Sequence, residues 1–206
     1  MSFAFLLQGK LSLIKFCIYV IAQNLGAFIA SMLVYLVYLN EFTLYQPGWH
    51  SIESSSVFGT LPRNLTHEST IKTISLFFDQ FYASMLFVIC VLAISDNNNT
   101  TAKLPHTIKA LYIGFALMLV GTSFGINCGF AVNPARDFGP RMFTLIFGWG
   151  AKVFETGSYF FWIPIVAPMF GALFAVAIYE FVIGNNLDKS NENISSPEMT
   201  LASTRL

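Results

Sequence analysis

The chain has 206 residues, of which 55% are hydrophobic and only 11% are charged, and its 11 Lys plus Arg balance its 11 Asp plus Glu. A soluble domain normally carries about 25% charged residues, so this composition argues against an ordinary soluble protein and favours a membrane protein. The zero net charge gives no indication of a nucleic-acid partner. Three scattered cysteines without metal-ligand spacing argue against a disulfide framework and are expected to be buried packing residues: Cys17, Cys90 and Cys128.

Four segments are long and apolar enough to cross a bilayer, which takes about 20 mostly apolar residues. They are expected at residues 11–39, 73–95, 108–125 and 159–183. Two shorter apolar pieces cannot cross a membrane alone and suit half-helices or re-entrant segments, residues 2–7 and 134–147. The sequence therefore predicts an all-α membrane protein with four spans.

The connections between the spans are polar. Residues 40–72 contain Gly, Pro and Ser and carry Asn64 in an Asn-Leu-Thr sequon, a glycosylation site if this loop faces the exterior. Residues 185–206 are rich in Asn and Ser and are expected to form a disordered cytosolic tail.

An internal repeat links the first and fourth predicted spans. Residues 22–30 and residues 167–175 both follow the pattern Ala-x-x-x-Gly-Ala-x-x-Ala. Small residues at helical spacing let membrane helices approach closely. The ordinary interpretation is that two packed spans share small residues, but equivalent positions, each after a short apolar piece, favour duplicated halves.

The most informative stretch follows the third span and reads Gly-Phe-Ala-Val-Asn-Pro-Ala-Arg-Asp-Phe-Gly-Pro-Arg, residues 129–141. Asn133 is a favoured N-cap and Pro134 suits the first helical position, so a helix is expected to begin here with its positive dipole end toward an uncharged stretch. A helix that begins at membrane depth must line a cavity or be buried in protein. Arg136 is costly in such surroundings, which indicates a functional residue rather than an interfacial one.

This stretch resembles the aquaporin superfamily, the major intrinsic proteins, and within it the glycerol-conducting aquaglyceroporin branch. The motif is followed by Gly-Trp-Gly at residues 148–150, and Asp137 directly after Arg136 is typical of the glycerol branch. Phe-Phe-Asp-Gln-Phe at residues 77–81 and Ala-Ile-x-Asp at residues 93–96 are further marks of the family. The resemblance covers nearly the whole chain to about residue 184.

The resemblance implies a selectivity filter formed by Arg136, Phe130 and Gly121, in which Gly121 leaves space that a larger side chain fills in water-selective relatives. It also implies that the half-helix of the motif, Asn133, Pro134, Ala135 and Asp137, presents an amide donor at mid-pore. Backbone carbonyls along the pore would come from Gly129, Phe130 and Ala131. Gln80 is expected to hydrogen-bond the loop before the half-helix. Cys128 lies close to these residues in sequence, so thiol reagents are expected to block the pore.

The chain departs from the family pattern at its beginning. The family has six spans and two Asn-Pro-Ala half-helices in an inverted repeat, whereas this chain has four spans and one such motif. Residues 2–5, Ser-Phe-Ala-Phe, resemble those that follow the family's first motif. The expected architecture is thus an aquaporin-like bundle in residues 1–184, with one complete and one partial half-helix and without the first two membrane helices and the first motif.

The function implied is passive conduction of glycerol, small uncharged polyols, urea and water through a multi-pass protein, expected in the plasma membrane as a homotetramer. The alternative is a non-conducting fragment or isoform that acts as a partner of full-length subunits. An enzyme is disfavoured because the spans contain no paired acid and base residues. The three histidines lie in predicted loops at no metal spacing, so no metal or cofactor is expected: His50, His67 and His106.

Overall fold

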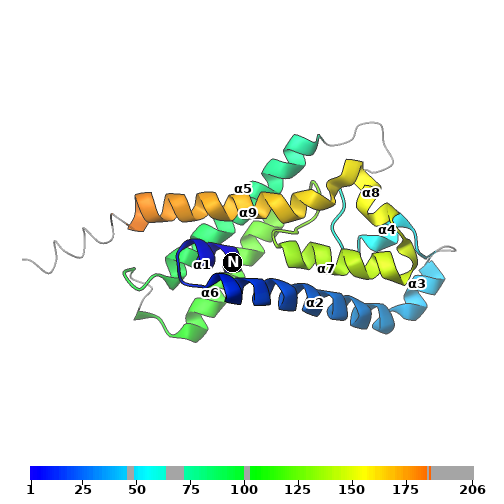
Figure 1. Cartoon of the computed structure of the whole chain (residues 1–206), viewed down its shortest axis with the longest axis horizontal. Coiled ribbons are helices and arrows are strands. Elements are labelled where there is room, and N and C mark those ends of the chain that lie inside the picture. Colours follow the sequence, from blue (N-terminus) through cyan, green and yellow to red (C-terminus); the bar gives the residue numbers. More distant parts are fainter. Residues whose placement is uncertain (46–48, 64–71, 100–102, 185, 187–206) are drawn as a thin grey trace, which may run out of the picture.

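A computed structural model of the chain describes residues 1–45, 49–63, 72–99, 103–184 and 186, and within these residues it contains helices and no strands (Figure 1). The predicted glycosylation site at Asn64 and the predicted tail lie outside the described residues, apart from residue 186. The elements in chain order are α1 (Ser2–Leu7), α2 (Leu13–Val37), α3 (Leu39–Tyr45), α4 (Ile52–Ser55), α5 (Thr73–Ser95), α6 (His106–Phe124), α7 (Pro134–Thr144), η2 (Leu145–Trp149), α8 (Lys152–Tyr159), η3 (Phe160–Trp162), α9 (Ile163–Ile178) and η4 (Tyr179–Gly184).

In the part of the chain that the structure describes, four helical stretches are long and apolar enough to cross a membrane, in agreement with the predicted number of spans. Three of them are α2, α5 and α6, and the fourth runs from Lys152 to Gly184. The backbone leaves helical geometry at the end of α8, where Gly157 and Ser158 have φ angles of +65° and +57°. This break separates α8 from α9, so the continuous fourth span begins near residue 160, close to its predicted start.

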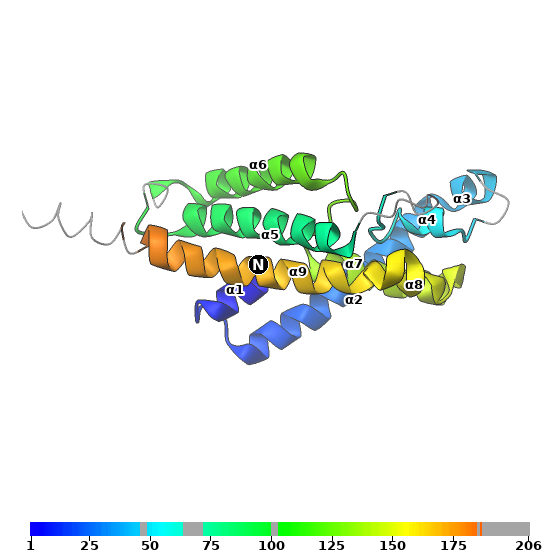
Figure 2. The ribbon, with the colours of Figure 1, turned by 90° about the horizontal axis from the view of Figure 1, so that it is seen from above.

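The long helices α5 and α9 pack against each other along the centre of the molecule, and α6 lies along the other side of α5. Figure 2 shows α6 and α2 on opposite sides of the α5–α9 pair. Gly171 makes the central crossing possible, because a Cβ at this position would lie 2.5 Å from the carbonyl oxygen of Phe81. The small-residue pattern of the fourth span is therefore used for close helix packing, as predicted.

The equivalent pattern in α2 works differently. A Cβ added at Gly26 would have no atom within 4 Å, so the lack of a side chain at this position is not needed for packing within the described residues. The close approach instead comes from Gly139 of α7, where an added Cβ would lie 2.6 Å from the carbonyl oxygen of Asn24 and 2.9 Å from the Cβ of Ala27. The α2 repeat thus receives the half-helix α7, which lies between α2 and α9 (Figure 1).

The short helix α1 contacts both α2 and α9. Ala4 is fully buried in an apolar cluster that includes Val88 of α5 and Ala175 of α9. At the start of α1, the amide of Gln23 in α2 donates a hydrogen bond to the hydroxyl of Ser2 at 3.0 Å. These contacts pack the predicted partial half-helix against α2 and α9, with Ala4 as its buried residue.

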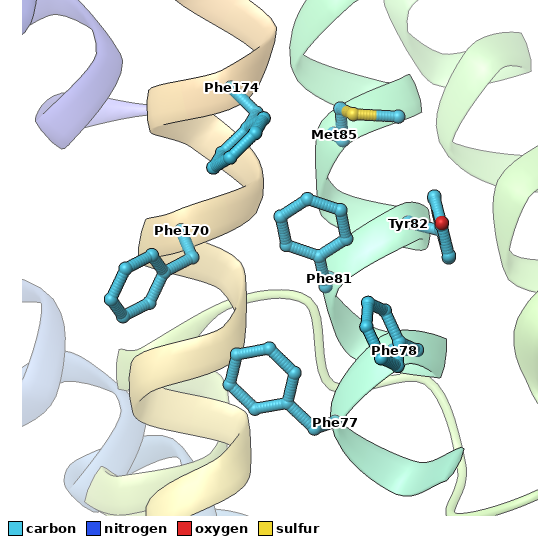
Figure 3. A pocket seen from close by; sticks show the side chains of 7 residues that line it. All are labelled: Phe77, Phe78, Phe81, Tyr82, Met85, Phe170 and Phe174. Carbon is cyan, nitrogen blue, oxygen red and sulfur yellow. The ribbon is translucent and has the colours of Figure 1, made fainter. Parts of the chain in front are cut away.

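The outward faces of α2 and α6 are apolar and largely uncovered. Only 6% of the most hydrophobic window of each helix is buried, compared with 44% for α5 and for the fourth span. A shallow apolar groove also runs between α5 and α9, lined by aromatic rings that include Phe77, Phe81 and Phe174 (Figure 3). Such surfaces suit contact with lipid tails or with other membrane helices.

An aromatic cluster closes the end of the molecule where α3, α4 and η2 meet. The ring of Tyr35 stacks on Trp49 with centroids 5.4 Å apart, and Trp49 stacks on His50 at 4.0 Å. The indole N–H of Trp149 donates a hydrogen bond to the hydroxyl of Ser54 at 2.8 Å. This cluster fixes the loop of residues 49–62 over the C-terminal end of α7.

Candidate functional site

The half-helix α7 begins as its sequence predicts. Asn133 is the N-cap, with an extended backbone (φ −147°, ψ 113°), and its side-chain oxygen accepts a hydrogen bond from the N–H of Ala135 at 3.1 Å. Pro134 is the first helical residue, where its missing N–H costs nothing. The side chain of Asn133 is exposed, and none of the described residues accepts a hydrogen bond from its Nδ2. A free amide donor therefore stands beside the positive end of the helix dipole.

The segment before α7 has an unusual backbone that α5 holds in place. Gly129 has a φ of +77° and Val132 a φ of +40°, which is strained for a β-branched residue. Gln80 bridges the two ends of this segment: its Nε2 donates to the Gly129 carbonyl oxygen at 3.2 Å, and its Oε1 accepts from the Val132 N–H at 2.9 Å. The expected contact between Gln80 and this loop is thus confirmed.

The predicted row of carbonyls is only partly free. The Gly129 carbonyl is engaged by Gln80, whereas none of the described residues donates to the carbonyl oxygens of Phe130 and Ala131. Phe130 and Ala131 therefore retain acceptors that a solute could use, and Gly129 contributes mainly through its contact with α5.

Gly121 of α6 lies directly against the ring of Phe130. A Cβ at position 121 would lie 3.1 Å from both Cδ1 and Cε1 of that ring, closer than ordinary contact. The structure therefore brings two of the predicted filter residues together. The space beside Gly121 is filled by the Phe130 ring rather than left open, which refines the expectation that Gly121 provides an empty gap.

Arg136 lies in the first turn of α7, and its side chain is exposed. Its Nη1 donates a hydrogen bond to the backbone carbonyl of Phe58 at 3.0 Å. Phe58 belongs to the loop after α4 and is itself buried. One contact to a fixed carbonyl orients the guanidinium while its other donors stay available, because an Arg offers five N–H groups.

Asp137, the next residue, points away from solvent into a buried ion pair. It is fully buried, and Arg141, one turn later, is 2% exposed with a salt-bridge distance of 2.8 Å. Thr60 donates to the same carboxylate through its backbone N–H at 2.8 Å and through its hydroxyl. Arg141 also donates to the carbonyl oxygens of Thr60 at 2.7 Å and of Val153 at 2.6 Å. The pair therefore fastens the loop of residues 49–62 and α8 onto α7.

Of the three cysteines that were expected to be buried, Cys128 is buried, Cys90 is partly buried and Cys17 is exposed, so the expectation is wrong for Cys17. Cys128 is 1% exposed, and its sulfur contacts the amide of Gln80 at 3.3 Å and the carboxylate of Asp79 at 3.6 Å. Burial, followed by the neighbouring Asp79 carboxylate, raises the pKa of the Cys128 thiol to about 12. The thiolate is the reactive form, so the expected ready block by thiol reagents does not agree with this geometry.

Sequence reasoning missed three residues that build this site. Thr60 and Phe58 lie in a long polar loop, where no pattern indicates which residue meets which helix. Arg141 could have been found, because Asp137 and Arg141 are four residues apart on one helix and opposite charges at that spacing face each other.

These observations define an all-helical membrane protein with a capped half-helix, whose exposed Asn133 and Arg136 follow a strained segment with free carbonyls. The chain belongs to the major intrinsic protein family, whose model matches residues 1–179. It is similar to Aquaporin-10 of Homo sapiens (34% identity over 186 residues, 88% of this chain and 60% of that protein) and to Aquaporin-9 of Homo sapiens (36% over 186 residues, 88% and 61%). Aquaporin-10 of Milnesium tardigradum is 34% identical over 212 residues, which cover 94% of this chain and 50% of that protein.

Among solved structures, the X-ray structure of the aquaglyceroporin from Plasmodium falciparum matches with a TM-score of 0.79 and 28% identity, over 91% of this chain and 72% of that chain. The predicted family and fold class are thereby confirmed. The chain spans 50 to 61% of the length of the curated relatives named above.

Proposed function

We propose that this chain forms the conducting wall of an aquaglyceroporin-type channel that passes glycerol, small uncharged polyols, urea and water by passive diffusion. The observation that supports it most strongly is the arrangement at the start of α7. Exposed donors of Asn133 and Arg136 at the start of α7 directly follow, along the chain, the segment that carries the free carbonyls of Phe130 and Ala131 and the apolar ring of Phe130. A linear polyol has hydroxyls along one side and carbons along the other, so it suits such a surface.

The charges of this site oppose the passage of ions. Arg136 contributes a positive charge, and the helix N-terminus adds a positive dipole end. Both raise the barrier to cations and protons while leaving uncharged solutes free to pass. Asp137 does not offset this charge at the site surface, because its carboxylate is fully buried against Arg141.

We further propose that the assembly is a homotetramer in the plasma membrane, with Asn64 glycosylated on the exterior face. Membership of the major intrinsic protein family motivates the first two proposals, and the Asn-Leu-Thr sequon at residues 64–66 motivates the third. Native mass spectrometry of the detergent-solubilised protein tests the tetramer. A shift in mass after glycosidase treatment that disappears in Asn64→Gln tests the sugar, and fluorescence microscopy of a tagged chain tests the location.

The proposed conduction is tested by reconstituting the chain into liposomes and following volume changes by stopped-flow light scattering under glycerol, urea and sucrose gradients. We expect glycerol and water permeability above those of empty liposomes, and no permeability to sucrose. Arg136→Met is the matched variant, expected to keep solute flux but to admit protons, read with a pH-sensitive dye inside the vesicles. A chain that is inserted and folded yet gives flux equal to empty liposomes would contradict the proposal and support the non-conducting alternative.

A further inference from the structure

Asp79 is a buried carboxylate beside the segment that precedes α7, and it pairs with no cation among the described residues. It lies in the second turn of α5 and is 8% exposed. Its Oδ1 accepts a hydrogen bond from the side-chain amide of Asn127 at 2.9 Å. Its Oδ2 accepts from the Gln80 amide at 3.0 Å and contacts the Cys128 thiol at 3.6 Å. A buried charge is costly unless hydrogen bonds compensate it, so a carboxylate that is held here by three donors calls for an explanation.

The amide of Gln80 has only one orientation that suits its neighbours. The Val132 backbone can only donate through its N–H, so the oxygen of Gln80 must face it. The Gly129 carbonyl and the Asp79 carboxylate can only accept, so the nitrogen of Gln80 must face both. Turning the amide over would place oxygen against two oxygens and nitrogen against an N–H.

We propose that Asp79 is a positioning residue that locks the amide of Gln80 and thereby holds the strained segment from Gly129 to Val132. This proposal rests on the proposed function for its effect on solutes, because the segment carries the free carbonyls of Phe130 and Ala131. Gln80 contacts the segment at both ends, and Asp79 adds a third partner that favours the same orientation of the Gln80 amide.

A carboxylate suits this role because all of its neighbours present donors to it. Asn127, Gln80 and Cys128 all present donors to it, and an ionised carboxylate is a pure acceptor with sites for all three. Hydrogen bonds to a charged acceptor are also the stronger ones. The backbone carbonyl of Asn127 in turn accepts a hydrogen bond from the backbone N–H of Arg63 at 2.8 Å, so the network reaches from α5 to the loop before it.

Cys128 provides a probe of the segment, because its buried thiol precedes Gly129 and contacts both Gln80 and Asp79. The test measures the rate of maleimide labelling of Cys128 in the full chain in detergent, with Cys17→Ala and Cys90→Ala in the background so that one thiol remains. Five proteins are compared in that background: unchanged, Asp79→Ala, Asp79→Asn, Gln80→Glu and the double variant Asp79→Asn/Gln80→Glu. Far-UV circular dichroism and gel filtration show that each is folded.

We expect Asp79→Ala and Gln80→Glu to speed labelling at least about tenfold, the size of effect that follows from losing a hydrogen bond to a charged group. Asp79→Asn keeps one acceptor for Gln80, and Asn127 can turn its own amide to match, so labelling stays within about threefold of the unchanged background. In Gln80→Glu two carboxylates face each other. Adding Asp79→Asn to that variant supplies a donor, so the double variant labels more slowly than Gln80→Glu.

In the Gln80→Glu background, Asp79→Asn is thus expected to slow labelling, whereas a generally destabilising change would speed it. This difference distinguishes a positioning role from general destabilisation. Two independent destabilising changes would make the double variant label as fast as or faster than Gln80→Glu, and that result would overturn the proposal. Labelling of Asp79→Ala at the unchanged rate would overturn it as well. Asp96→Asn is the matched control. The Asp96 carboxylate directly follows α5 and accepts a hydrogen bond from the Tyr179 hydroxyl at 2.7 Å. We expect this substitution to leave Cys128 labelling unaltered.

The labelling result does not depend on conduction. In liposomes, we expect Asp79→Ala to lower the ratio of glycerol to water permeability, because displaced carbonyls affect a polyol more than a single water. A chain that conducts nothing but shows the expected labelling pattern would support the positioning role and contradict the proposed function. If Asp79→Ala leaves Cys128 labelling unchanged while the chain conducts glycerol normally, the proposed function is supported and the positioning role is contradicted.

Discussion

The contact between Gly139 and α2 sets how deeply the half-helix α7 sits in the bundle, and replacing Gly139 by Ala tests it. The new Cβ would start 2.6 Å from the Asn24 carbonyl oxygen, whereas ordinary contact begins at 3.4 Å. The two helices must therefore separate by about 0.8 Å, the difference between these distances. The obstacle is backbone, which cannot turn aside as a flexible side chain can.

Two opposing energies decide the result. Overpacking a tight contact typically costs about 1–3 kcal/mol. Replacing Gly by Ala within a helix stabilises the helix by about 1 kcal/mol, because Ala has the higher helix propensity. Because the clash is with backbone, we expect a net loss of about 1–2 kcal/mol, which lowers the melting temperature of a chain of this size by about 2–8 °C.

Gly26→Ala is the matched control, since it changes the same residue type in the neighbouring helix, where nothing lies within 4 Å of the added carbon. It is expected to raise the melting temperature by about 2–4 °C, because only the helix-propensity gain remains. Thermal unfolding in detergent, followed by tryptophan fluorescence, measures both. If Gly139→Ala stabilises the chain as much as Gly26→Ala does, α7 is not held against α2 at this distance and the packing argument is wrong.

Two further predictions concern the site itself. Arg141→Met leaves the Asp137 carboxylate buried without its cation and should lower the free energy of unfolding by about 3–5 kcal/mol, measured by thermal unfolding. Arg136→Met is the control and should change the free energy of unfolding by less than about 1 kcal/mol. Equal effects of the two variants would refute the structural role of the pair. Cys128 should react with maleimide far more slowly than the exposed Cys17 at pH 7, because it is buried and burial raises the pKa of its thiol, and peptide mass spectrometry can follow both rates. Comparable rates at pH 7 would show that the segment opens readily.

The sequence predicted the parts of this site that depend on local chemistry. The start of α7 follows from Asn133 and Pro134, because a cap and a preorganised first residue act within one turn. The four spans follow from length and apolar composition. The family followed from one long motif, and the prediction that Gln80 contacts the loop before α7 followed from the resemblance.

The remaining parts depend on contacts between distant segments. The loop residue Thr60 meets both Asp137 and Arg141, 77 and 81 positions later, and nothing in its local sequence marks it. The repeat in α2 was correctly expected to allow close packing, but the glycine that needs the space is Gly139 of the partner helix rather than Gly26. Which of two helices supplies the small residue at a crossing is settled by three-dimensional fit, not by either pattern alone.

The aromatic cluster at the end of the bundle gives the protein an optical signal of its own. The chain has three tryptophans, and two of them, Trp49 and Trp149, lie with ring centroids 6.3 Å apart. His50 stacks on Trp49 and meets Trp149 edge-on at 4.6 Å, so its imidazole ring is positioned to quench both indoles. Emission from these rings therefore reports directly on whether the loop over α7 is docked, without any added dye.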